Sequence, residues 1–116
     1  MSRVRLALEQ MQLAIDKIQR YTPPSREAFV ADEMRRDSIE RNLIMLGDAA
    51  TRIPRDFQDA HPEIPWGQII GMRNTLTHEY DKTKPEIVWN TIVNDLDPLR
   101  QRLDAVLSSP TFRDRD

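Results

Sequence analysis

Residues 4–18, VRLALEQMQLAIDKI, decide the fold class of this chain. Their apolar side chains recur at alternating intervals of four and three residues, which places Val4, Leu8, Met11, Ile15 and Ile18 along one face of an α-helix. No window of the chain shows the two-residue alternation and β-branched enrichment that are typical of a strand. The sequence therefore predicts an all-α fold, an up-and-down antiparallel bundle of four to five helices.

Two consecutive prolines mark the end of the first predicted helix. Pro23 and Pro24 cannot donate a helical backbone hydrogen bond, and proline also pushes the residue before it out of the α region. Ser25 then suits the N-cap of a second helix, which we predict from about residue 26 to residue 50. Its predicted buried face consists of Phe29, Ile39, Leu43, Leu46 and Ala50.

Helical periodicity fails over residues 51–65, a segment that contains three prolines. This composition is typical of an irregular connector, which we expect to carry one short turn of helix. Pro65 suits the first position of a short apolar helix, because the N–H that proline lacks is not needed there. The polar segment 78–84 is expected to lead out of that helix.

The last predicted helix begins at Pro85, and its apolar face consists of Val88, Ile92, Leu96, Leu99, Leu103 and Val106. Pro98 falls inside this pattern, where proline breaks or kinks a helix. With Asp97 as the cap and Pro98 at the first helical position, the sequence predicts two consecutive helices that run in one direction. From about residue 108 onward the polar sequence predicts a frayed tail.

Length and composition exclude several classes of protein. The 116 residues suit a single domain over residues 1–116 and are too few for two domains. The absence of cysteine excludes disulfides and thiolate metal sites. The chain has neither a signal-like apolar amino terminus nor the run of about 20 apolar residues that a membrane span requires, so we expect a soluble, cytoplasmic protein.

Net charge alone does not favour a nucleic-acid partner. Residues 1–60 hold ten basic and ten acidic side chains, whereas residues 61–116 hold seven basic and nine acidic ones, which gives the net charge of −2. Neither half resembles a polybasic arm. The composition therefore provides no general electrostatic attraction for a phosphate backbone.

The residues that could form a catalytic site lie near one of the two histidines of the chain. His61 lies in the proline-rich connector, where a solvated loop residue is expected. His78, in contrast, lies within eight residues of Arg73, Asn74 and Tyr80. Arginine offers a forked donor for phosphate, histidine a general acid or base near neutral pH, and asparagine a neutral donor and acceptor. These groups suit the cleavage of a phosphodiester without a metal.

Helical geometry supports part of this arrangement. Asn74 and His78 are four residues apart and share a helix face, whereas Arg73 and His78 are five apart and point away from each other. They converge only if the helix unwinds near His78 or if a second copy of the chain supplies one of them. A purely structural alternative remains, because cations near a helix C-terminus interact with its dipole. No metal-ligand spacing and no glycine-rich phosphate loop is present, so we expect no metal and no cofactor.

Four stretches of the chain carry a resemblance to a known family. Arg73-x4-His78-x-Tyr80 matches the signature R-x4-H-x-Y, and residues 41–50 look like the pattern R-x-L-x-x-x-G-E-A of a second helix. Residues 64–74 look like the run I-P-W-x-x-I-x-G-x-R-N, and residues 87–99 look like a closing helix. In these features the chain resembles the HEPN superfamily, in its branch of HepT-like toxins that are paired with a minimal nucleotidyltransferase antitoxin.

The resemblance implies a fold, an assembly and an activity. It implies a four- to five-helix HEPN bundle, a homodimer whose motifs face a shared cleft, and a metal-independent ribonuclease toxin that cleaves RNA, either tRNA or mRNA, and leaves a 2′,3′-cyclic phosphate. Carried over to this chain, Arg73 would bind the scissile phosphate, His78 would transfer a proton and Asn74 would support both. Tyr80 is similar to the tyrosine that the partner nucleotidyltransferase modifies with AMP, a group that would occupy the anion site beside Arg73.

Two positions depart from the family pattern. Glu79 stands between the histidine and the tyrosine, where glycine is common, and its charge repels RNA locally. Asp48 stands where glutamate is usual. Two alternatives to a ribonuclease remain: a non-catalytic HEPN helical dimer module that binds a nucleotidyltransferase or a nucleotide, and a plain structural bundle.

Overall fold

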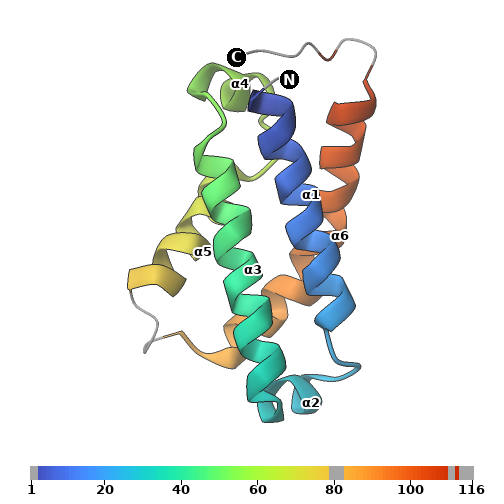
Figure 1. Cartoon of the computed structure of the whole chain (residues 1–116), viewed down its shortest axis with the longest axis vertical. Coiled ribbons are helices and arrows are strands. Elements are labelled where there is room, and N and C mark those ends of the chain that lie inside the picture. Colours follow the sequence, from blue (N-terminus) through green and yellow to red (C-terminus); the bar gives the residue numbers. More distant parts are fainter. Residues whose placement is uncertain (1–2, 79–82, 110–111, 113–116) are drawn as a thin grey trace.

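The computed structural model describes residues 3–78, 83–109 and 112, and it shows six helices within them (Figure 1). No strand is present in this part of the chain, so the predicted all-α fold is confirmed. The helices are α1 (Arg3–Tyr21), α2 (Arg26–Ala31), α3 (Glu33–Thr51), α4 (Arg55–Ala60), α5 (Trp66–His78) and α6 (Pro85–Ser108).

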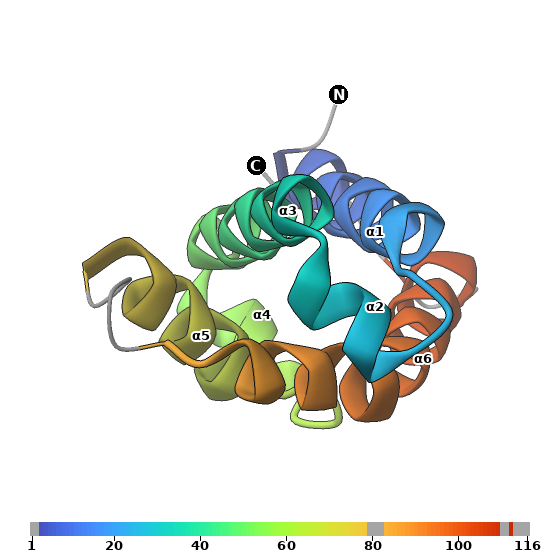
Figure 2. The same cartoon turned by 90° about the horizontal axis from the view of Figure 1, so that it is seen from below.

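The three long helices form an antiparallel bundle around one core. In Figure 1, α1 runs in the opposite direction to α3 and α6, and it packs against both. Seen along the bundle in Figure 2, α1 and α3 lie side by side, with α5 and α6 on the opposite side of the core. The predicted apolar face of the first helix is buried throughout, at 0–2% exposure for Val4, Leu8, Met11, Ile15 and Ile18. The sequence periodicity therefore identified the core of the fold correctly.

The predicted second helix is divided in two, so the prediction of one helix over residues 26–50 is wrong. Asp32 has extended backbone angles (φ −103°, ψ 90°), and it both ends α2 and caps α3. Its side chain accepts a hydrogen bond from the Arg35 backbone N–H at 3.0 Å, which satisfies a donor at the start of α3. Ser25 caps α2 as predicted, because its hydroxyl accepts from the Ala28 N–H at 3.1 Å.

The proline-rich connector contains α4, which accounts for the expected short turn of helix. Phe57 on α4 is 5% exposed and fixes this helix to the core. The division at Asp32 and the presence of α4 explain why the described chain has six helices rather than the four or five expected.

The last helix is continuous, so the prediction of two successive helices at Pro98 is wrong. Pro98 lies inside α6 on its exposed side, while Leu96 and Leu99 on the opposite side are 2% and 4% exposed. Pro98 lacks the backbone N–H of a normal helical hydrogen bond, and the burial of Leu96 and Leu99 keeps the helix continuous despite this loss. The helix α6 bends along its length and does not break (Figure 1). None of the helices in the described ranges has the length and apolar character needed to cross a membrane.

Candidate functional site

The candidate site is built where α5 crosses α3, and the two helices approach closely at Gly47. A Cβ atom added at Gly47 would lie 2.1 Å from the Arg73 Cβ and 3.3 Å from the backbone oxygen of Ile69. No side chain fits in this space, so glycine is what allows the two helices to come together. At this crossing the Cβ and Cγ atoms of Arg73 pack directly against α3 at Gly47.

The guanidinium of Arg73 is held by two neighbours. Its Nε donates to the Asp48 Oδ1 at 2.7 Å, and its Nη1 donates to the Asn74 Oδ1 at 2.9 Å. Within the described residues these bonds use two of the five N–H donors of a guanidinium. The Arg73 side chain is 31% exposed, so this pre-oriented cation can meet an anion that arrives from solvent.

Asn74 contacts the arginine rather than the histidine. Its Oδ1 accepts from Arg73, and the structure shows no hydrogen bond between the described side chains of Asn74 and His78. Asn74 and His78 therefore share a face of α5 as predicted, but the expected hydrogen bond between their side chains is not formed. The amide instead helps to fix the direction in which the guanidinium points.

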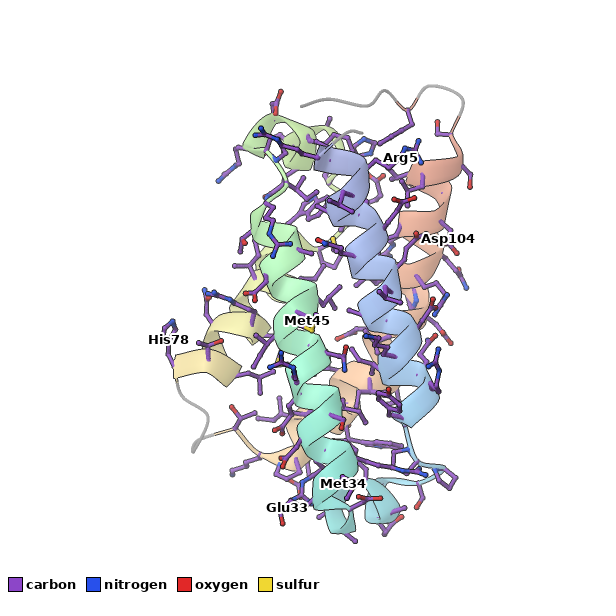
Figure 3. The ribbon with its side chains drawn as sticks, viewed as in Figure 1. Arg5, Glu33, Met34, Met45, His78 and Asp104 are labelled. Carbon is purple, nitrogen blue, oxygen red and sulfur yellow. The ribbon has the colours of Figure 1, made fainter. Side chains whose placement is uncertain are left out.

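His78 is the last residue of α5 and is exposed to solvent. Figure 3 shows it at the outer end of α5, away from α1. Because α5 is helical from Trp66 to His78, the helix does not unwind between Arg73 and His78. Five residues correspond to a rotation of about 500°, so the two side chains leave the helix roughly 140° apart. Within one chain, the structure does not bring Arg73 and His78 together.

Tyr80 and Glu79 lie outside the described residues. The predicted modification of Tyr80 and the effect of Glu79 therefore stay predictions from the sequence.

His61 has a structural role at the entry to α5. Its ring stacks against Phe57 with the ring centroids 4.5 Å apart, and its Nδ1 lies 3.2 Å from the Glu63 Oε2. Its backbone oxygen accepts from the Trp66 indole N–H at 3.0 Å. His61 is therefore packed between α4 and α5 rather than freely solvated as the sequence suggested.

Asp48 falls within a family pattern, but nothing in the sequence identifies it as the partner of Arg73. The two residues are 25 positions apart, and only the crossing of α3 and α5 joins them. The signal in the sequence is Gly47 inside an otherwise helical segment, because a glycine within a helix often has a packing reason.

The described part of the chain offers no obvious metal site. It contains no cluster of three or more His, Asp or Glu side chains that could hold a metal ion. A cavity of about 260 Å³ lies between α3, α5 and α6, lined mostly by apolar residues such as Leu43, Ile69 and Leu96, with Gln68, Thr91 and Asp95 among them. Neither Arg73 nor His78 lines it, so the candidate catalytic groups belong to the surface of the bundle.

Comparison with known proteins places this chain in a family. The sequence model described as "Ribonuclease HepT-like" matches residues 11–106. The chain is 33% identical over 90 residues to "Putative RNase TTE0752" of Caldanaerobacter subterraneus, covering 78% of this chain and 80% of that protein. It is also 33% identical over 100 residues to "Probable ribonuclease HepT" of Thermococcus cleftensis, covering 85% and 91% of the two chains. No solved structure matches significantly. This chain therefore belongs to the HepT-like ribonuclease family, as its resemblance to HEPN proteins implied.

Proposed function

We propose that this protein is a metal-independent endoribonuclease toxin that acts on tRNA or mRNA in the cytoplasm. The observation that supports the proposal is the fixed guanidinium of Arg73, held by Asp48 and Asn74 at the crossing of two helices and open to solvent. An arginine that is oriented before the substrate arrives needs no rearrangement to bind a phosphate or to stabilise the charge that develops on it. Membership of a ribonuclease family makes RNA the expected substrate.

The proposed reaction uses the 2′-hydroxyl of the RNA itself. The 2′ oxygen attacks the adjacent phosphorus and the bond from phosphorus to the 5′ oxygen breaks, which leaves a 2′,3′-cyclic phosphate and a 5′-hydroxyl. His78 accepts the proton of the attacking hydroxyl or donates one to the leaving oxygen. Arg73 stabilises the pentacovalent phosphorane, and Asn74 keeps the guanidinium in position.

We further propose that the active unit is a homodimer. Arg73 and His78 of one chain point in different directions because α5 stays helical to its last residue. Two copies related by a two-fold axis would place Arg73 of one protomer and His78 of the partner subunit in a shared cleft. This arrangement satisfies the geometry that a single chain does not provide.

Purified protein is expected to cleave single-stranded RNA in the presence of EDTA. The products should carry 2′,3′-cyclic phosphate ends, and a DNA strand of the same sequence should stay intact because it lacks the attacking hydroxyl. Gel electrophoresis and mass spectrometry of the products measure both results. If folded, unmodified protein left RNA intact over long incubation, the chain would instead be a non-catalytic module that binds a nucleotidyltransferase or a nucleotide.

Neutralisation is proposed to occur by AMP transfer from a minimal nucleotidyltransferase antitoxin to Tyr80. An added phosphate-bearing group near Arg73 would occupy the anion site and repel RNA. Co-expression with a nucleotidyltransferase encoded by a neighbouring gene should raise the intact mass by whole AMP units. Tyr80→Phe should abolish this increase, whereas loss of toxicity with no change in mass would show that complex formation alone is responsible.

A further inference from the structure

A groove of about 350 Å³ runs between α1 and α3, on the face of the bundle away from α6. Lys17 on α1, Arg41 and Asp48 on α3 and Arg52 at the C-cap of α3 are among the residues that line it. Arg41, Asp48 and Arg52 recur at spacings of seven and four, and because the C-cap Arg52 keeps αR backbone angles they lie along one face of α3. The groove is therefore a continuous surface feature and not a gap between unrelated loops.

The charge of this groove is opposite to that of the whole chain. Its lining carries three cations and one carboxylate, a balance of +2, whereas the chain carries a net charge of −2. The carboxylate, Asp48, already accepts a hydrogen bond from Arg73. Arg52 donates to the neutral amide of Gln10 at 2.8 Å, so its charge is oriented but not cancelled. The groove therefore attracts anions on a protein that overall does not.

We propose that this α1–α3 groove binds the phosphodiester backbone of the RNA substrate and directs it toward Arg73. The inference rests on the proposed ribonuclease function. Asp48 makes the path continuous, because it lines the groove and also holds the guanidinium of Arg73. Lys17, Arg41 and Arg52 contact phosphates on one side of the scissile bond, and Arg73 contacts the scissile phosphate itself.

Single-stranded RNA fits this surface better than a second copy of the chain does. At a two-fold interface the same patch meets itself, so three cations would face three identical cations. The groove also exposes two apolar side chains, Leu13 at 51% and Met45 at 46%, and Figure 3 shows Met45 midway along α3. RNA provides partners for both kinds of side chain, because it carries anionic phosphates beside the apolar faces of its bases.

Acidic residues set one limit of the proposed path. Asp37 and Glu40 line a neighbouring depression on α3 that shares Arg41, Met45 and Asp48 with the groove. A phosphate backbone is repelled from these carboxylates and is kept on the side of α3 that faces α1. The strand is therefore expected to follow the side of α3 that faces α1, along Lys17, Arg41 and Arg52.

The test compares two triple variants that change the net charge equally. The groove variant replaces Lys17, Arg41 and Arg52 with glutamine, and the control variant replaces Arg26, Arg55 and Arg102, which lie on α2, α4 and α6. Both carry His78→Ala so that RNA is bound without being cut. Fluorescence anisotropy with a labelled single-stranded RNA measures the dissociation constant at several salt concentrations, and circular dichroism checks folding.

The logarithm of the affinity falls with the logarithm of the salt concentration, and each phosphate contact on a single strand contributes about −0.7 to this slope. Because the groove variant loses three such contacts, its slope is expected to be less negative by about 2. The control variant should keep the slope of its His78→Ala parent.

Equal slopes in the two triple variants, or no RNA binding by the parent, would overturn the proposal. It would also be overturned if only the groove variant lost its dimeric mass in sedimentation, because the groove would then be a protein interface. Binding that depends on the groove in a wild-type protein that cuts no RNA would refute the ribonuclease function and leave the groove assignment standing.

Discussion

RNA cleavage is expected to fall by about a hundredfold or more when Arg73 is replaced by alanine, because a pre-oriented donor that stabilises transition-state charge is lost. His78→Ala is expected to reduce cleavage by a similar factor, since a general acid or base contributes about 10² to 10⁴. Initial rates on a labelled RNA measure both effects. Arg102→Ala on α6 is the matched control, because it removes an exposed arginine far along the chain from the candidate site.

The Arg73→Ala variant should stay folded. The ion pair that it removes joins side chains that are 31% and 38% exposed, and exposed pairs contribute no more than about 1 kcal/mol. Alanine also keeps the Cβ that packs over Gly47. A folded Arg73→Ala protein that cuts RNA at the wild-type rate would therefore contradict the assigned role of Arg73 directly.

Mixing the two inactive variants tests whether the site is shared between chains. If Arg73 and His78 of one site come from different protomers, each mixed dimer contains one complete site. Random assembly should then restore about a quarter of the wild-type rate, because half of the dimers are mixed and each has one of two sites intact. Mixing Arg73→Ala with a double variant that carries both Arg73→Ala and His78→Ala should restore nothing, because no chain then supplies Arg73. No recovery in the first mixture would show that the site is not composite.

Gly47→Ala is expected to destabilise the fold by about 1–3 kcal/mol, as overpacking does in other cores. The new Cβ would lie 2.1 Å from the Arg73 Cβ and 2.7 Å from its Cγ, and neither helix can relieve this contact by rotating a side chain. The helices must separate, although alanine is favoured over glycine within a helix by about 1 kcal/mol. RNA cleavage should fall as well, since a displacement of about 1 Å at a reacting group can cost about a hundredfold.

Gly71→Ala on α5 is the control for this substitution. Nothing lies within 4 Å of a Cβ added at Gly71, so only the helix propensity changes and the free energy of unfolding should rise slightly. Urea unfolding followed by circular dichroism measures both variants. If Gly47→Ala were as stable as Gly71→Ala, the close crossing of α3 and α5 would be wrong.

The sequence predicted the core more reliably than the helix boundaries. The apolar periodicity of residues 4–18 and the buried face of residues 26–50 depend on side chains whose burial the three-dimensional structure reproduces. The interruption at Asp32 was missed because aspartate is tolerated in a helix and becomes a cap only in a particular backbone conformation. The continuity of α6 through Pro98 was missed because it depends on the burial of neighbouring leucines against other helices.

In the candidate site too, the sequence indicated some features, whereas others depend on how the helices pack. Arg73, Asn74 and His78 could be proposed as candidates from the sequence because they are close neighbours and match a family motif. The match over residues 11–106 confirms the family that the motif indicated. The bond between Arg73 and Asp48 was not predictable, since it depends on how α5 crosses α3. The cationic groove was hidden for the same reason, because its residues come from two helices and are diluted by acidic residues elsewhere in the chain.

The contact at Gly47 also has an evolutionary consequence. The atom that excludes a side chain at position 47 is the Cβ of residue 73, which every amino acid except glycine possesses. We therefore expect selection for the fold to retain glycine at position 47 even in a descendant whose arginine has been lost. Among diverged sequences, glycine with arginine would mark proteins that keep the chemistry, whereas glycine without arginine would mark proteins that keep only the scaffold.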